Sequence, residues 1–163
     1  MKYFMENNAW QALRLSLSFI MLWAFFDKFF GLGFATESSK SWLSGVSPTS
    51  GFLQFVPDGL FAPVFNSLSG NIFIDFMFMG GLFLVGLCLL LGIGIKIASY
   101  SGALIMLLIY LSLFPPENNP LIDEHIIYIL VFFGLSIRVR EQKFALGKKW
   151  IKTSLVKKYP ILE

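Results

Sequence analysis

Long runs of apolar residues, separated by short polar stretches, extend along most of the chain. A helix needs about 20 mostly apolar residues to cross about 30 Å of hydrocarbon. Residues 10–30, 76–95 and 97–114 meet this requirement. The fourth run, residues 126–137, is too short at about 1.5 Å per residue, so a crossing there must extend over residues 121–137. The pattern predicts an all-α integral membrane protein, a four-helix bundle with a long capping loop between helices one and two.

The composition agrees with a single membrane domain over residues 1–163. Hydrophobic residues make up 56% of the chain and charged residues 14%, whereas a soluble domain carries about 25% charged residues. This balance excludes a disordered chain and argues against an ordinary soluble enzyme. Lys2, the apolar run and the small residues near Ala35 also fit a secretory signal peptide; we interpret residues 10–30 as a retained membrane helix.

Basic residues are concentrated on one side of the predicted membrane domain. The predicted inner side, including Arg14, the 2–3 connection and the tail, carries a net charge of +8, and the predicted outer side, including the outer ends of the spans, carries −5. Cytoplasmic segments are enriched in lysine and arginine, so both termini are predicted to face the cytoplasm. The protein is thus expected to be a multi-pass protein of the cell membrane, with lipids and not nucleic acid as its charged partners.

The long loop, the basic tail and Arg14 carry further expectations. Residues 31–71 are too long and too apolar for a structureless loop, and they are predicted to cap the outer end with short helices near residues 38–43 and 63–68. The basic tail, residues 138–163, either lies on the anionic inner leaflet or is frayed and solvated. Arg14 is expected to extend to the inner headgroups, the alternative being a buried polar contact.

Small residues are frequent in the second and third spans, where they let membrane helices approach closely. The expected packing residues are Gly80, Gly81, Gly86, Gly92, Gly94, Ala98, Gly102 and Ala103. Cys88, the only cysteine, is expected to be an inert thiol within the second span.

Ionisable residues within a membrane domain indicate function, and most of them lie at the predicted outer ends of the spans. They are Asp27, Lys28, Asp75, Asp123, Glu124 and His125. Histidine titrates near neutral pH, so His125, the only one in the chain, is the best candidate for moving a proton. Tyr128 lies on the same helix face and is expected to share a hydrogen bond with His125 or a ligand. The alternative is structural: an interfacial Asp27–Lys28 pair, and acids in a first helical turn.

Several classes of site lack the residues they need. One histidine and one cysteine cannot build a zinc, haem or iron–sulfur site within one chain. No P-loop or dinucleotide-binding glycine pattern occurs. Redox chemistry would therefore use a diffusible carrier, such as a membrane quinone, or a partner subunit.

Four stretches carry a family resemblance. They are LWAFFDKF at residues 22–29, WLSGVSPTSGFL at 42–53, PPENNP at 115–120 and DEHIIY at 123–128. With these residues the chain resembles the DoxX/DoxD family of four-helix bacterial and archaeal membrane proteins. Within that family it is similar to the large subunit of thiosulfate:quinone oxidoreductase, and the likeness covers residues 12–137.

The resemblance implies oxidation of thiosulfate to tetrathionate, with electrons passed to a membrane quinone. It also implies a small partner subunit, and a homo-oligomer is a further expectation. The candidate catalytic residues are His125, Asp123 and Tyr128, with Asp123 setting the tautomer of His125. The candidate residues for binding substrate or quinone are Lys28, Asp27, Asp75, Trp42 and Asn119. Because thiosulfate is a dianion, the net charge of −5 on the outer side opposes its electrostatic steering.

Two other functions stay open. The bundle could anchor or assemble a redox partner without catalysis, using its basic tail and its small-residue faces. It could instead carry a small molecule or a lipid. A bound quinone would favour the oxidoreductase, a partner without a ligand would favour the module, and an opening to both leaflets would favour the carrier.

Overall fold

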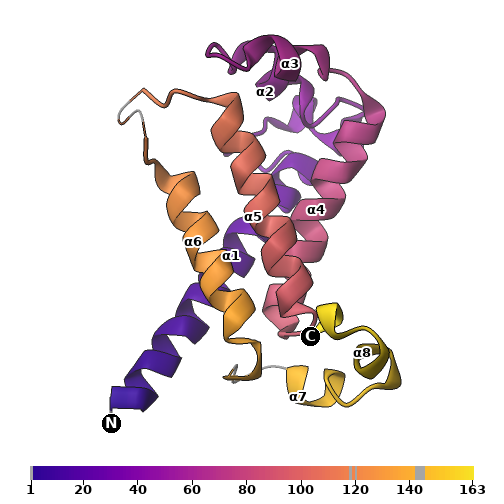
Figure 1. Ribbon diagram of the computed structural model, residues 1–163. Coiled ribbons are helices and arrows are strands. Elements are labelled where there is room, and N and C mark those ends of the chain that lie inside the picture. Colours follow the sequence, from indigo (N-terminus) through magenta and orange to yellow (C-terminus); the bar gives the residue numbers. More distant parts are fainter. Residues whose placement is uncertain (1, 118, 120, 142–145) are drawn as a thin grey trace.

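The computed structural model describes residues 2–117, 119, 121–141 and 146–163, and these residues form helices and connecting turns without a strand (Figure 1). The four longest helices are α1 (Lys2–Phe30), α4 (Ile72–Leu91), α5 (Ile95–Ser112) and α6 (Glu124–Ile137). The shorter ones are η1 (Ser38–Lys40), η2 (Trp42–Ser44), α2 (Ser50–Phe55), α3 (Ala62–Ser67), η3 (Val139–Glu141), α7 (Gly147–Trp150), α8 (Ser154–Lys158) and η4 (Pro160–Leu162). The all-α prediction is confirmed for this part of the chain.

Three helices are long and apolar enough to cross a membrane: Asn7–Phe30 within α1, α4 and α5. Their positions follow the predicted spans, but α4 begins at Ile72, before the predicted residue 76. The side chain of Asn71 caps this helix by accepting a hydrogen bond from the backbone N–H of Phe73 at 2.9 Å. The helix ends at Leu91 because Gly92 adopts a left-handed conformation with φ of 67°.

The fourth predicted span differs from the observed helix. We expected a crossing over residues 121–137, whereas α6 has 14 residues and begins at Glu124. At about 1.5 Å per residue it is about 21 Å long, which is shorter than the hydrocarbon core. The late start has a local cause, because Asp123 is in an extended conformation and caps the helix.

The four long helices pack as two pairs. α1 lies along α4, α5 lies along α6, and α4 joins the pairs by packing against α5. In Figure 1 both ends of the chain lie at the end of the molecule that carries α7 and α8, while α2 and α3 lie at the opposite end. The buried core consists of Leu17, Met21, Leu82, Val85, Leu89, Ile95, Ala98, Ala103, Met106, Phe132, Leu135 and Val139.

The predicted packing residues have different surroundings, and Gly80 is not a packing residue because an added Cβ there would meet nothing within 4 Å. Gly86 and Gly102 are packing residues as predicted, because an added Cβ would collide with Leu22 and with the ring of Phe132 respectively. Gly92 and Gly94 serve a different purpose, and their assignment to packing is wrong. Both have positive φ values, 67° and 57°, and they form the tight turn between α4 and α5.

The long connection between α1 and α4 contains short helices, as predicted. η1 and η2 cover the region expected near residues 38–43. α3 starts one residue before the predicted 63–68, with Pro63 in its first turn. The sequence analysis missed α2, whose first residues are Ser50 and Gly51.

Arg14 is fully buried, with 0% of its surface exposed, so its expected extension to the headgroups is wrong. Its Nη1 donates to the backbone oxygens of Leu89 and Leu90 near the end of α4. Its Nη2 donates to Oε1 of Gln11 at 3.4 Å. The last carbonyls of a helix carry partial negative charge, so the guanidinium stabilises the contact between α1 and α4. The alternative prediction, a buried polar contact, is the one observed.

The basic tail is folded where the structure describes it. Residues 146–163 form α7, α8 and η4, and η4 packs against α5. The alternative prediction of a frayed, solvated tail is therefore wrong for these residues. Lys143, which belongs to the predicted tail, lies outside the described residues.

Candidate functional site

Asp27 holds the beginning of the long connection against α1. It lies in the last turns of α1 and is 2% exposed. Its Oδ1 accepts a hydrogen bond from the backbone N–H of Phe34 at 3.3 Å, and its Oδ2 accepts one from Ala35 at 3.0 Å. Gly31 has φ of 68° and lies so close to Ser38 that an added Cβ would collide with its backbone. The carboxylate of Asp27 therefore acts as an anchor for a tight reversal of the chain.

Asp75 has the same kind of role at the start of α4. It is 5% exposed, and its Oδ1 accepts hydrogen bonds from Oγ of Ser47 at 2.8 Å and from Oγ1 of Thr49 at 2.5 Å. The Ser47 hydroxyl also accepts from the backbone N–H of Ser50 at 3.1 Å. The SPTS part of the resemblance thus binds the connection to α4 through one buried carboxylate.

Trp42 packs between these two anchors. Its ring meets Phe29 of α1 edge-on at a centroid distance of 5.9 Å and Phe76 of α4 at 5.1 Å. Aromatic pairs of this geometry add stability beyond the apolar area that they bury. The structure therefore gives Trp42 a packing role between the end of α1 and the start of α4.

Lys28 lines a hollow of about 280 Å³ beside the end of α1. The other lining residues are Phe19, Ile20, Trp23, Ala24, Asp27, Phe34 and Ala35. The carboxylate of Asp27 is occupied by backbone N–H groups, and among the described residues no carboxylate lies within ion-pair distance of Lys28. The predicted Asp27–Lys28 pair is therefore not a direct ion pair.

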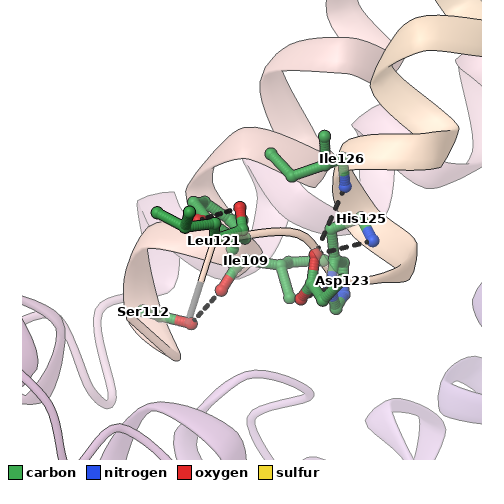
Figure 2. A network of polar contacts seen from close by, with 7 residues as sticks. Ile109, Ser112, Leu121, Asp123, His125 and Ile126 are labelled. Atoms are coloured by element: carbon green, nitrogen blue, oxygen red, sulfur yellow. Dashed lines mark hydrogen bonds and ion pairs between the residues drawn. The ribbon is translucent and has the colours of Figure 1, made fainter. Parts of the chain in front are cut away.

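Asp123 and His125 form a carboxylate–imidazole pair at the start of α6 (Figure 2). Oδ2 of Asp123 lies 2.8 Å from Nδ1 of His125, and the side chains are 11% and 14% exposed. Oδ1 of Asp123 accepts from the backbone N–H groups of His125 at 3.0 Å and Ile126 at 3.3 Å. Asp123 thus caps the helix and orients the imidazole at the same time. We expected Asp123 to set the tautomer of His125, and the 2.8 Å contact between Oδ2 and Nδ1 is the geometry that this role requires.

The segment before α6 is fixed to the end of α5. The hydroxyl of Tyr110 donates to the backbone oxygen of Leu121 at 2.9 Å. Oδ1 of Asn119 accepts from the backbone N–H groups of Leu121 at 3.1 Å and Ile122 at 3.3 Å. Figure 2 shows Leu121 and Asp123 beside the end of α5, which carries Ile109 and Ser112. Asn119 therefore forms the turn that leads to Asp123, while Asn118 and Pro120 of the same motif lie outside the described residues.

Tyr128 does not pair with His125. Its ring packs against the hydrophobic core, and in the described part of the chain its hydroxyl makes no hydrogen bond to protein. The expected hydrogen bond between the two side chains is therefore wrong, and only a bond to a ligand is left of that prediction.

Glu124, next to the Asp123–His125 pair, adds a third side-chain atom that could coordinate a metal ion. Asp123, Glu124 and His125 each place a ligand atom within 4.8 Å of the others. Glu124 is exposed, and Nδ1 of His125 and both oxygens of Asp123 already have protein partners. Nε2 is the ring nitrogen of His125 that has no partner among the residues that the structure describes.

The predicted polar residues fall into two separate groups. Asp27, Lys28, Trp42 and Asp75 belong to the ends of α1 and α4, whereas Asn119, Asp123 and His125 belong to the start of α6. In Figure 1 the start of α6 lies on the other side of α5 from the start of α4, and it lies further from the α2–α3 end of the molecule. No hydrogen bond or ion pair among the described residues joins the two groups. The expectation of one pocket shared by all these side chains finds no support.

The sequence analysis missed a buried polar stripe on α1. Asn7, Gln11, Arg14 and Ser18 are all buried, and Oγ of Ser18 donates to the backbone oxygen of Gly86 at 2.8 Å. Their spacing of four, three and four residues places them on one helix face. That spacing is the signal that could have found the stripe, because a polar face in an apolar helix is directed away from lipid.

A comparison of the chain with family models, curated proteins and solved structures gives no match. The resemblance to the DoxX/DoxD family therefore stays a prediction, and so do the roles that it implies for these residues.

Proposed function

We propose that the protein crosses the cell membrane four times and acts as the membrane subunit of a quinone-linked oxidoreductase. Three apolar helices support the multi-pass arrangement. α6 gains length for a fourth crossing from the apolar residues Leu121 and Ile122, which precede its cap. In this orientation the basic tail faces the cytoplasm, and residues 31–71 face the other side.

The observation that carries the catalytic part is the 2.8 Å contact between Oδ2 of Asp123 and Nδ1 of His125. A carboxylate that accepts the Nδ1 proton leaves the lone pair on Nε2, and it stabilises the imidazolium once Nε2 is protonated. Nε2 has no protein partner among the described residues. It is therefore free to exchange a proton with a ligand.

These residues fit the headgroup of a quinone, which takes up two electrons and two protons when it is reduced to a quinol. The imidazolium of His125 donates a hydrogen bond from Nε2 to one carbonyl oxygen and passes one proton to it. Water supplies the second proton and reprotonates Nε2. Asp123 holds the ring in place through both proton transfers. The hydroxyl of Tyr128, one helical turn away, is a second donor to the ligand.

The electrons come from a reduced sulfur compound oxidised with a partner subunit. For thiosulfate, two molecules join through a new sulfur–sulfur bond to form tetrathionate and release two electrons, which is the number that one quinone accepts. Thiosulfate is the substrate that the family resemblance implies. The negative outer side favours a binding site on the partner subunit, since Lys28 and Lys40 are the only cations in the outer part of the sequence.

The test is quinone reduction in proteoliposomes that contain the protein and its native partner, followed by quinone absorbance after thiosulfate addition. His125→Gln removes the proton-exchanging nitrogen, and we expect a rate about 100-fold lower because general acid–base catalysis contributes about that much or more. Glu124→Gln is the matched control. This exposed neighbour lies in the same turn, and its variant should keep the rate within about twofold.

Two results would contradict the proposal. One is a wild-type rate of quinone reduction no higher than that of vesicles with the partner alone. The other is a His125→Gln rate equal to that of Glu124→Gln.

A non-catalytic assembly module is the second candidate. It is favoured by the use of Asp27 and Asp75 as anchors for the connection between α1 and α4, because Asp27 accepts through both of its oxygens and Asp75 accepts two hydroxyl hydrogen bonds through Oδ1. A module of this kind should purify with its partner yet reduce no quinone.

A further inference from the structure

The tail after residue 146 is fixed to the turn between α4 and α5. The backbone N–H of Leu146 donates to the oxygen of Leu91 at 2.9 Å, and that of Lys96 donates to the oxygen of Glu163 at 2.8 Å. Gly147 lies so close to the backbone oxygen of Gly92 that an added Cβ would collide with it. The tail is therefore an ordered layer on this end of the molecule.

The position of this layer follows from the helices above it. α4 contains one charged residue, Asp75 at its far end, and α5 contains only Lys96, in its first turn. Two apolar helices joined by a tight turn place that turn at the surface of the membrane that they cross. The docked tail then lies at the depth of the lipid headgroups.

The layer presents unpaired positive charge. The two acids in and near this layer are paired with arginines: Glu141 accepts from Arg138 at 2.9 Å, and Glu163 accepts from Arg140 at 2.8 Å. The hydrogen bond and the charge of Glu163 hold the pKa of Arg140 above its ordinary value. Five exposed lysines have no carboxylate partner among the described residues: Lys148, Lys149, Lys152, Lys157 and Lys158.

One of these lysines borders a hollow between the tail and the turn. The hollow has a volume of about 260 Å³ and is lined by Ile93, Leu146, Lys149, Trp150 and Thr153. The indole N–H of Trp150 donates to the backbone oxygen of Leu162 at 2.5 Å, and the hydroxyl of Thr153 donates to that of Trp150 at 2.7 Å. The walls are therefore held in place by hydrogen bonds within the tail.

We propose that this hollow binds an anionic phospholipid, with the phosphate at Lys149 and the start of an acyl chain against Ile93 and Leu146. The apolar walls favour a lipid over a free phosphate, and the unpaired lysines favour an anionic over a zwitterionic headgroup. Trp150 lines the hollow, and at the depth of the headgroups it lies where tryptophan is enriched in membrane proteins. The inference rests on the membrane placement of α4 and α5 and not on the quinone chemistry.

The test is native mass spectrometry of the purified full chain, titrated with phosphatidylglycerol and with phosphatidylcholine of the same acyl chains. We expect the wild-type protein to bind phosphatidylglycerol more tightly than phosphatidylcholine. Lys149→Gln should weaken phosphatidylglycerol binding about fivefold, the effect of one lysine at an anionic surface. Lys157→Gln is the matched control, with the same loss of charge outside the hollow, and it should change binding by less than twofold.

Three results would overturn the proposal. Equal losses in Lys149→Gln and Lys157→Gln would indicate diffuse attraction to the whole basic layer. Equal affinity for the two lipids would exclude recognition of the charge. Displacement of phosphatidylglycerol by glycerol phosphate at equal concentration would identify a site for a soluble phosphate. Thermal unfolding of both variants at the wild-type temperature shows that they are folded, and quinone reduction plays no part in the readout.

Discussion

Asp75 and Asp123 are both carboxylates at the start of an apolar helix, but their surroundings differ. Asp75 is almost completely buried and accepts two hydroxyl hydrogen bonds from the connection between α1 and α4. Asp123 is partly exposed and orients an imidazole whose second nitrogen has no protein partner in the described part of the chain. The comparison shows that ionisable residues in a membrane protein are not all functional by position. A carboxylate whose partners are hydroxyls and backbone N–H groups is an anchor. A carboxylate that orients a histidine can take part in chemistry through the second nitrogen of that histidine.

The largest expected effect on stability comes from Asp75→Ala. The change removes both hydrogen bonds to a charged acceptor and leaves the buried hydroxyl of Thr49 without one. Hydrogen bonds to charged groups contribute about 1.5–3 kcal/mol each, so we expect the free energy of unfolding to fall by about 3 kcal/mol. Unfolding in mixed micelles of increasing denaturing detergent measures it.

The control for this variant is Asp58→Ala, because Asp58 is an exposed acid of the same connection. Its free energy of unfolding should stay within about 0.5 kcal/mol of the wild-type value, as is usual for surface changes. If the free energy of unfolding of Asp75→Ala were equal to that of Asp58→Ala, Asp75 would not be an anchor. The contrast with Asp123 would then be lost.

Asp123→Asn separates the two roles of Asp123. Asparagine is as good a helix cap as aspartate, so stability should change by no more than about 0.5 kcal/mol. A neutral amide does not stabilise the imidazolium of His125, and we expect quinone reduction to fall about tenfold, which corresponds to about 1.4 kcal/mol. Rates and unfolding curves of the same preparations provide both values. An unchanged rate would mean that Asp123 is an anchor of the same kind as Asp75.

Tyr128→Phe has the smallest expected effect. The Tyr128 hydroxyl has no hydrogen-bond partner among the described residues, so its removal should leave the free energy of unfolding within about 0.5 kcal/mol. If the hydroxyl donates to the quinone, the Michaelis constant for quinone should rise about threefold to tenfold, the size of one ordinary hydrogen bond. A Michaelis constant equal to that of the wild-type protein would remove Tyr128 from the site.

Much of the fold could be predicted because a membrane demands long apolar runs, and α1, α4 and α5 supply them. The helix ends were less accurate, since they depend on single caps such as Asn71, Gly92 and Asp123. The buried polar residues of α1 recur every three or four residues, a spacing that places them on one helix face. The expected position of Arg14 rests on its depth in the membrane alone, and for that reason it is wrong.

The candidate site was predicted in part for a similar reason. Asp123 and His125 are two residues apart, and local geometry brings them together. The partners of Asp75 are 26 and 28 residues away, and no local pattern specifies such a contact. The expectation of a single pocket finds no support because the sequence predicts only the approximate depth of each polar residue. The start of α6 lies on the other side of α5 from the start of α4 and further from the α2–α3 end.

The central claim, that α6 crosses the membrane and returns the tail to the side of the N-terminus, has a direct test. Single cysteines replace the exposed residues Asp58, Glu117 and Ser154 in a Cys88→Ser background, and intact cells are treated with a membrane-impermeant maleimide. The account predicts that cysteines at positions 58 and 117 are labelled at once and that the one at 154 is labelled only after permeabilisation. Labelling of positions 117 and 154 on the same side would show three crossings and contradict the account.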